Sequence, residues 1–333
     1  MNTLIVSTAI FPVGGTGYGG IEKLVSYTAR ELARRGHAVV VAAPTGSVTP
    51  PWVRLIQTGP CGDFMVSELA AYYEYRPYLS QFDAILDYSH SKWAMRMNKL
   101  PAIGFIWHDP KALQCPEPDY NVAALSVWQA ARFQEIYKQQ VKVLDPHLGP
   151  SASPLPSKGR FLIEGKIGEK TGVLDAIAMC KELEVGLDII GVPGPGDPPE
   201  LLDKVKKECG NGITYWGGVS DEARMEFERE AQALIYPVTY PPGQGEAHSH
   251  KSVSVLLTGC PVVTYDQGAL SEVIAHGDMG FLAVNRTEFK DFMLQAGELK
   301  RDVIAWKAKE RWGFEATGDR LVKALEEVAK GSK

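Results

Sequence analysis

The residues near the N-terminus that are best suited to chemistry form a glycine-rich loop, placed between a short apolar run and a helical stretch. Five glycines fall within seven residues there, and they include the consecutive pair Gly19 and Gly20. Glycine permits positive φ and lets backbone N–H groups approach a ligand, and the start of the following helix attracts an anion. The loop therefore predicts phosphate binding, with a flexible surface loop as the alternative. A dinucleotide fingerprint fits less well, because the spacing is not G-x-G-x-x-G and no acidic residue closes the next apolar run at 38–44.

Histidines also stand where a sheet could present them to a ligand. His108 directly follows the apolar run at residues 103–106. Open α/β sheets bind ligands beyond the carboxyl ends of their strands, so we expect His108 to line a site, with a capping or core role as the alternative. His248 and His250 are two residues apart, but no third ligand follows at a recognisable spacing, and no metal site is expected.

These side chains must be positioned by elements that alternate along the whole chain. Strand-like apolar runs followed by helical patterns are typical of parallel sheets with helices on both faces, which is an α/β fold. Strands are predicted at residues 4–7, 39–43, 84–86, 103–106, 161–163, 187–190, 213–215, 233–236 and 261–264. Helices are predicted at residues 21–35, 65–75, 122–139, 172–184, 199–209, 221–230 and 252–257, and a polar helix from Arg311 onward.

The length and one turn-rich segment predict two domains. A chain of 333 residues exceeds what one hydrophobic core usually serves. The segment at 148–157 is rich in proline and serine and lacks periodicity, as a linker would. We expect an N-terminal Rossmann-like domain over residues 1–148 and a C-terminal Rossmann-like domain over residues 149–312. A C-terminal helix at about 313–333 is expected to pack back on the first domain.

Charge and cysteine content exclude several classes of partner. The net charge is −5, whereas a nucleic-acid surface normally carries a basic excess, so no nucleic-acid partner is expected. The five cysteines are widely spaced and contain no C-x-x-C pair, which favours a reduced, cytoplasmic protein. No apolar run approaches the roughly 18 residues that span a bilayer. Peripheral membrane contact stays open.

Several motifs occur in order over nearly the full length of the chain. Residues 19–22 read Gly-Gly-Ile-Glu and residues 35–39 read Arg-Gly-His-Ala-Val. Further matches are Asp145-Pro146, Gly-Cys-Pro-Val-Val at 259–263, Gly-Ala-Leu-Ser-Glu-Val at 268–273 and Gly-Asp-Met-Gly-Phe-Leu at 277–282. In these motifs the chain resembles the GT-B retaining glycosyltransferases of family 4, the glycosyl transferases group 1. The resemblance implies two Rossmann-like domains facing each other across a cleft, and sugar transfer from a nucleotide-diphosphate sugar with retention of configuration.

The resemblance also implies how the leaving diphosphate is stabilised. Family members use backbone amides and basic side chains in place of a metal ion. We therefore expect no cofactor besides the nucleotide-sugar donor, and we expect the amides of Gly19 and Gly20 to contribute. The family motif Gly-Arg-x-x-x-x-Lys-Gly places Lys166 on the arginine position and Thr171 on the lysine position, with Lys170 one residue early. Lysine lacks the bidentate fork of arginine, so this exchange is not conservative.

A second departure concerns the two glutamates that family members carry with seven residues between them. The first corresponds to Glu246, which is expected to face the donor sugar together with His108, and these two are the predicted catalytic residues. The second falls on Ser254, and a serine cannot grip a ribose diol as a carboxylate does. The donor sugar and ribose are expected to contact His248, Ser249, His250 and Ser254. Lys251 is expected to restore the phosphate contact that Thr171 lacks.

Three functional classes stay open at this level. The leading prediction is a metal-independent hexosyltransferase-like enzyme, whose acceptor is a glycan, a lipid-linked sugar or a small molecule. A noncatalytic relative that keeps the fold as a binding partner is the alternative, because of Ser254 and Thr171. A nucleotide-sugar epimerase is less favoured, since no carboxylates flanking the sugar are found. The acceptor is expected to be chosen by the unpatterned stretches around 50–63 and 110–120.

Overall fold

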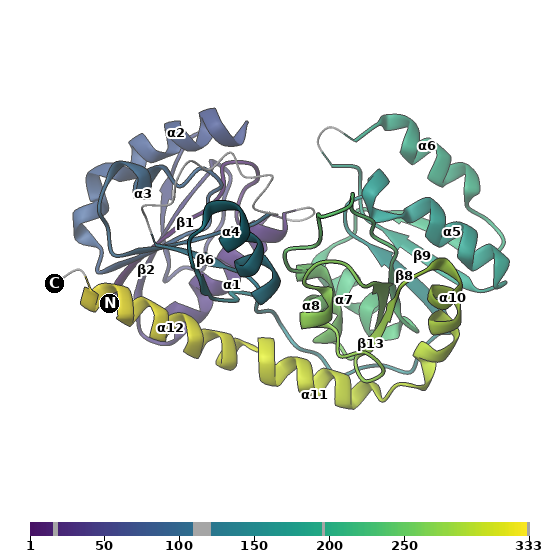
Figure 1. Ribbon diagram of the computed structural model, residues 1–333. Coiled ribbons are helices and arrows are strands. Elements are labelled where there is room, and N and C mark those ends of the chain that lie inside the picture. Colours follow the sequence, from purple (N-terminus) through teal and green to yellow (C-terminus); the bar gives the residue numbers. More distant parts are fainter. Residues whose placement is uncertain (16–18, 109–120, 195–196, 332–333) are drawn as a thin grey trace. The chain divides into compact units, whose positions relative to one another are not determined.

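The structure is a computed structural model that describes residues 1–15, 19–108, 121–194 and 197–331. The described chain divides into two compact units, each with one parallel sheet between helices (Figure 1). The first unit contains residues 1–15, 19–148 and 314–331, and the second contains residues 149–313. The predicted α/β fold class is therefore confirmed.

The first unit is built on a seven-stranded sheet in the order β3-β2-β1-β4-β5-β6-β7. Its strands are β1 (Asn2–Val6), β2 (Ala38–Ala43), β3 (Arg54–Gln57), β4 (Ala84–Asp87), β5 (Ala102–Phe105), β6 (Val122–Ala124) and β7 (Lys142–Val143). Neighbouring strands pair in parallel, with Thr3 of β1 opposite both Val39 of β2 and Ala84 of β4. All carboxyl ends consequently lie at one edge of the sheet, where the segments after β4 and β5 meet.

Helices cover both faces of this sheet because side chains alternate along each strand. The helices are α1 (Gly20–Arg34), α2 (Phe64–Tyr75), α3 (Trp93–Met97), α4 (Val127–Tyr137) and α12 (Phe314–Gly331), with a 3-10 turn at Arg76–Gln81. Ile5 packs in the cluster that contains Leu24 of α1 and Leu321 of α12. Its neighbours Leu4 and Val6 pack in the cluster of α2. The C-terminal helix thus completes one face of the first unit.

The second unit is built on a six-stranded sheet in the order β10-β9-β8-β11-β12-β13. The strands are β8 (Arg160–Glu164), β9 (Gly186–Ile190), β10 (Ile213–Gly217), β11 (Leu234–Tyr236), β12 (Val262–Tyr265) and β13 (Gly280–Ala283). The helices are α5 (Val173–Glu182), α6 (Pro199–Glu208), α7 (Asp221–Glu230), α8 (His250–Leu256), α9 (Leu270–Val273), α10 (Arg286–Gln295) and α11 (Arg301–Trp312). Short 3-10 turns lie at Glu169–Thr171 and Ala296–Glu298. Helices α5, α6 and α10 cover one face, and α7, α8 and α11 cover the other.

Two of the predicted elements need correction. The helix predicted over residues 122–139 begins with strand β6 at Val122–Ala124, and helix α4 starts only at Val127. The stretch 50–63, predicted to be unpatterned, contains strand β3, whose residues are only partly covered. The sequence also gave no prediction for α10, whose amphipathic pattern is weak.

The described residues bear on two expectations, namely the absence of a membrane-spanning segment and the absence of cysteine pairing. Within residues 1–15, 19–108, 121–194 and 197–331, no helix is long and apolar enough to cross a bilayer. The four cysteines described there, Cys61, Cys180, Cys209 and Cys260, are free.

Candidate functional site

In the second unit, glycines bring several loops together at the carboxyl edge of the sheet. Gly165 follows β8 with φ +96° and Gly191 follows β9 with φ +132°. A Cβ on Gly191 would lie 1.8 Å from the carbonyl oxygen of Gly165, so no side chain fits there. Gly268, which follows β12, would place a Cβ 2.4 Å from the backbone nitrogen and oxygen of Glu246. Glycine at these positions lets the loops that carry Lys166 and Glu246 pack closely at one edge of the sheet.

The carboxylate of Glu246 is held by two tyrosine hydroxyls. Tyr236 donates to its Oε2 at 3.0 Å and Tyr240 donates to the same oxygen at 2.7 Å. Burial and then the charge of Glu246 raise the pKa of both tyrosines, so both remain donors at neutral pH. The backbone carbonyl of Glu246 also accepts from the N–H of Ala269 at 2.8 Å. Glu246 is thus a half-buried carboxylate with a fixed orientation.

Lys251 belongs to a partly buried cluster of charges. Its side chain lies against Gly165, where a Cβ would come within 3.0 Å of its Cε. Its ammonium stands 4.1 Å from the centre of the Tyr236 ring. Burial lowers the pKa of Lys251, while the charges of Glu164 and Glu246 act in the opposite direction. The charge of Lys251 is therefore already matched by groups of the protein, and its contact with a donor diphosphate stays a prediction.

Lys166 and Thr171 have different surroundings from Lys251. Lys166 pairs with Asp197 at 3.0 Å and passes close to Gly194, where a Cβ would lie 2.6 Å from its Cε. Thr171 donates its hydroxyl to the carbonyl of Gly168 at 2.7 Å and accepts from the N–H of Gly168 at 3.2 Å. Its side chain closes a turn, which is a structural reason for threonine at this position.

Lys170 lies in the 3-10 turn at Glu169–Thr171, one residue from the closed turn. Its backbone carbonyl accepts from the N–H of Thr239 at 3.2 Å, which ties this turn to the segment after β11. Among the described residues, no hydrogen bond or ion pair connects its side chain with Lys166 or Lys251. Convergence of the three lysines on a phosphate therefore stays a prediction.

Ser254 is surrounded by charged groups that the sequence analysis did not identify. Arg224 of α7 donates to its Oγ at 2.8 Å, and Ser254 donates to Oε1 of Glu228 at 3.1 Å. Glu228 is only 1% exposed, and burial, followed by the charge of Glu164, raises its pKa. Oε2 of Glu164 is buried without a hydrogen-bond partner. A carboxyl group from α7 consequently stands beside the serine that replaces the second glutamate of the resemblance.

The predicted sugar-binding residues before Ser254 form the start of α8. Ser249 caps this helix by accepting from the N–H of Ser252 at 3.2 Å, and the two hydroxyls lie 2.8 Å apart. His248 is buried just before the cap, and His250 is the first helical residue. The helix thus starts two residues earlier than the sequence predicted. Contacts of these three residues with a sugar stay predictions.

In the first unit, His108 and His90 meet at the carboxyl ends of β5 and β4. Their rings are stacked, with centroids 5.3 Å apart and planes 7° apart. Glu68 of α2 accepts from the backbone N–H of His90 at 2.9 Å and holds the loop after β4. Loss of hydration, followed by the charge of His108, lowers the pKa of His90 to about 3. Loss of hydration and then the charge of Lys92 lower the pKa of His108, although its side chain is exposed. Both imidazoles are therefore neutral near pH 7.

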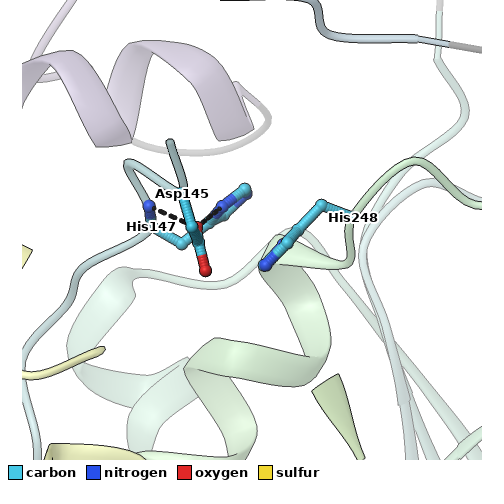
Figure 2. Close-up of side chains that lie close together, drawn as sticks. All are labelled: Asp145, His147 and His248. Carbon is cyan, nitrogen blue, oxygen red and sulfur yellow. Dashed lines mark hydrogen bonds and ion pairs between the residues drawn. The ribbon is translucent and has the colours of Figure 1, made fainter. Parts of the chain in front are cut away.

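Asp145 and His147, at the end of the first unit, form a compact turn that Figure 2 shows in detail. Oδ1 of Asp145 lies 2.6 Å from Nδ1 of His147 and accepts from its backbone N–H at 2.9 Å. Thr317 of α12 donates to the carbonyl of His147 at 2.8 Å. The Asp145-Pro146 motif thus fixes the point where the chain leaves the first unit.

Only part of the glycine-rich loop can be compared with the structure, since residues 16–18 lie outside the described residues. Gly19 has φ +145° and stands immediately before α1. A Cβ there would lie 3.0 Å from Oε2 of Glu22, which hydrogen bonds Thr8 and whose pKa is raised by burial. The N-terminus of α1 therefore already holds a carboxyl group of its own. The predicted acceptor stretch at 110–120 also lies outside the described residues.

Comparison with known proteins agrees with this architecture. Residues 165–299 match the family model of the glycosyl transferases group 1. Sucrose-phosphate synthase from Thermosynechococcus elongatus is similar in structure, with a TM-score of 0.81 and 13% identity over 99% of this chain and 100% of that chain. AviGT4, a glycosyltransferase involved in avilamycin A biosynthesis, has a TM-score of 0.77 and 19% identity over 99% of each chain.

A third solved structure is HepE from Anabaena in complex with UDP-glucose. It has a TM-score of 0.74 and 14% identity over 98% of this chain and 100% of that chain. No curated protein matches the chain. The predicted GT-B fold is confirmed by these structures, and the predicted resemblance to the group 1 family is confirmed over residues 165–299.

Proposed function

We propose that this chain, whose residues 165–299 match the family model of the glycosyl transferases group 1, transfers a sugar from a nucleotide-diphosphate sugar to an acceptor with retention of configuration. The observation that carries the proposal is the position of Glu246. Its carboxylate is oriented by Tyr236 and Tyr240 at the sheet edge where open α/β folds bind ligands. Because hydrogen bonds already fix this carboxylate, it does not need to reorient when charge develops on a reacting sugar, and the free-energy cost of reorganisation is small.

Within the second unit, each part of the donor has a proposed contact. Glu246 faces the sugar. Lys166 exchanges its ion pair with Asp197 for a contact with the diphosphate, and in this proposal its charge takes the place of a metal ion. A serine hydroxyl offers one donor and two acceptor positions. Ser254 donates to Glu228 and accepts from Arg224, so one acceptor position remains for a ribose hydroxyl. Glu228 thereby orients the ribose contact without touching the ligand.

The roles predicted for His108, Gly19 and Gly20 in the first unit remain part of the proposal. A neutral imidazole can donate a hydrogen bond to a sugar hydroxyl without adding positive charge. The pKa of His108 is lowered, which supports this neutral form. Uridine diphosphate sugars are the first donors to test, since HepE was solved with UDP-glucose.

The decisive experiment is nucleotide release from a panel of UDP-glucose, UDP-N-acetylglucosamine, GDP-mannose and ADP-glucose. We expect one donor to release its nucleotide, and the release to fall at least about tenfold in Glu246→Gln. Glu298→Gln is the matched control, because Glu298 is an exposed glutamate of the same unit. The anomeric configuration of the new bond, read by NMR on the product, tests retention.

A noncatalytic relative is the second candidate, favoured by the structural use of Thr171 in a turn. Calorimetric titration with UDP, GDP and ADP separates the two candidates. Failure of every nucleotide to bind would overturn the enzyme proposal. Binding without release from any donor would also contradict it, and would favour a nucleotide-binding partner protein.

A further inference from the structure

A pocket lies in the second unit, on the sheet face that α7 covers. It has a volume of about 390 Å³, within the range of small-molecule sites. We call it the α7 pocket. Its lining includes Arg160, Leu162, Asp188, Thr214, Trp216 and Glu226. Leu162, Asp188 and Thr214 are register partners on β8, β9 and β10. One row of side chains across three strands therefore forms its floor.

The α7 pocket is separate from the carboxyl-edge loops of the same sheet. Arg160 is the first residue of β8, whereas Gly165 follows the end of that strand. Five residues of extended chain span about 16 Å. Lys166, Glu246 and Ser254 do not line the α7 pocket. A ligand bound there would leave the proposed donor site unoccupied.

An indole ring forms an immobilised platform at the α7 pocket. Trp216 lines the α7 pocket and is 53% exposed, so part of its ring is accessible to a ligand. Its Nε1 donates to Oδ1 of Asp188 at 2.9 Å, and its ring lies against Phe227 with centroids 5.4 Å apart. Binding therefore costs little side-chain entropy, because the ring is already held. An exposed, fixed aromatic face suits a ligand with flat apolar C–H surfaces.

The charges around this platform select the chemistry of the ligand. Arg160 donates to Asp188 through Nε at 2.8 Å and through Nη2 at 2.7 Å. Lys158 pairs with Glu230 at 2.5 Å. With Glu226 the lining has two cations and three carboxylates, so a phosphorylated ligand would meet excess negative charge. Carboxylates accept hydrogen bonds only. Asp188 already accepts three hydrogen bonds from Arg160 and Trp216, which leaves it about one acceptor position, and Glu226 adds a second carboxylate for ligand O–H donors.

We propose that the α7 pocket binds a neutral oligosaccharide. Sugar rings combine flat C–H faces for Trp216 with multiple hydroxyls for Asp188 and Glu226. A nucleobase also stacks on an indole, but it offers far fewer donors to the carboxylates. The site holds a glycan away from the reaction centre and does not depend on the proposed transferase activity.

The test is calorimetric titration of the full chain with maltopentaose, cellopentaose and chitopentaose, and with uridine as comparison. At least one oligosaccharide is expected to bind, with Kd raised about tenfold or more in Trp216→Ala, because this substitution removes the aromatic face on which a sugar ring would lie. Trp216→Phe keeps a smaller ring and is expected to lose less. Trp306→Ala is the matched control, since Trp306 is 60% exposed on α11 and lies outside the α7 pocket.

Several results would overturn the proposal. One is that none of the oligosaccharides binds at about 10 mM, the range of weak millimolar binding. Another is an equal loss of affinity in Trp306→Ala, or binding that Trp216→Ala leaves unchanged. Loss of oligosaccharide binding in Lys166→Ala would move the site to the carboxyl-edge loops. Uridine binding that depends on Trp216 would replace the saccharide by a nucleobase.

Discussion

The buried glutamate Glu228 should make the stability of the protein depend on pH in an unusual direction. Glu228 is 1% exposed and pairs with Arg224. Burial and then the charge of Glu164 raise its pKa from 4.5 to about 8, and they outweigh the charge of Arg224, which lowers this pKa. A carboxyl group whose folded pKa is raised holds its proton in the fold at neutral pH. The contribution to stability is then fully present below about pH 4.5 and is lost as the pH rises through about 8.

The size of the effect follows from this shift. Each pKa unit corresponds to about 1.4 kcal/mol, so the shift of Glu228 sets a ceiling of about 5 kcal/mol. Between about pH 5.5 and pH 7.5, both inside the window, the free energy of unfolding should fall by about 3 kcal/mol because of this group. Other titrating groups also make the free energy of unfolding depend on pH. Their contribution cancels when the wild type is compared with a variant in which only Glu228 is changed.

Glu228→Gln provides that variant. A glutamine oxygen can still accept from Ser254, its amide can still donate toward Glu164, and the side chain no longer titrates. We expect urea unfolding to show that stability of the wild type falls by about 3 kcal/mol more than that of Glu228→Gln over this pH range. Glu226→Gln, an exposed glutamate on the same helix, should follow the wild type. Parallel pH dependence of the wild type and Glu228→Gln would refute the reasoning.

Four further predictions concern the candidate site. Glu246→Ala should lower turnover about tenfold or more, equal to about 1.4 kcal/mol of barrier, and an unchanged kcat/KM would remove Glu246 from the site. Lys166→Ala should raise the Kd of a nucleoside diphosphate about ten- to a hundredfold without weakening the nucleoside, because a charge-assisted contact is worth about 1.5 to 3 kcal/mol; equal effects on both ligands would contradict a phosphate contact. Lys251→Ala should instead lower the free energy of unfolding, because Glu164 would lose a partly buried counter-charge, and unchanged urea unfolding would contradict the partly buried cluster. His108→Ala should reduce activity with an unchanged Tm, whereas a collapse of the Tm would assign His108 to the core.

The sequence predicted the regular elements well where the apolar run was fully buried. Strand β1, with Leu4, Ile5 and Val6 covered on both faces, is a continuous apolar segment. It was predicted at residues 4–7, two residues late at its start and one residue too long at its end. Strand β3 reads Arg-Leu-Ile-Gln and is partly exposed at the sheet edge, so its pattern is too short to distinguish from a loop. Strand β6 is three residues long, and only two residues separate it from α4. The sequence pattern therefore predicted one helix over both elements.

The candidate site was predicted only as far as motifs identify single positions. Spacing from Gly259-Cys260-Pro261 located Glu246, but its tyrosine partners come from β11 and the loop that follows it, and no motif marks them. Glu228 was missed for a physical reason. A glutamate in a charged helix is usually solvated, and its burial depends on how α7 packs against β8. The fixed turn at Thr171 likewise depends on a local hydrogen bond that composition does not reveal.

The C-terminal helix α12 has a consequence for how the protein is made. Leu321, Ala324 and Leu325 belong to the core of the first unit, yet about 165 residues of the second unit separate them from Leu148. During synthesis on the ribosome, the second unit is complete before α12 leaves the exit tunnel. The earlier-synthesised strands of the first unit must therefore wait with one apolar face uncovered, exposed to chaperones or to aggregation. Truncation before Phe314 should leave a chain whose second half folds and whose first half stays vulnerable to proteolysis.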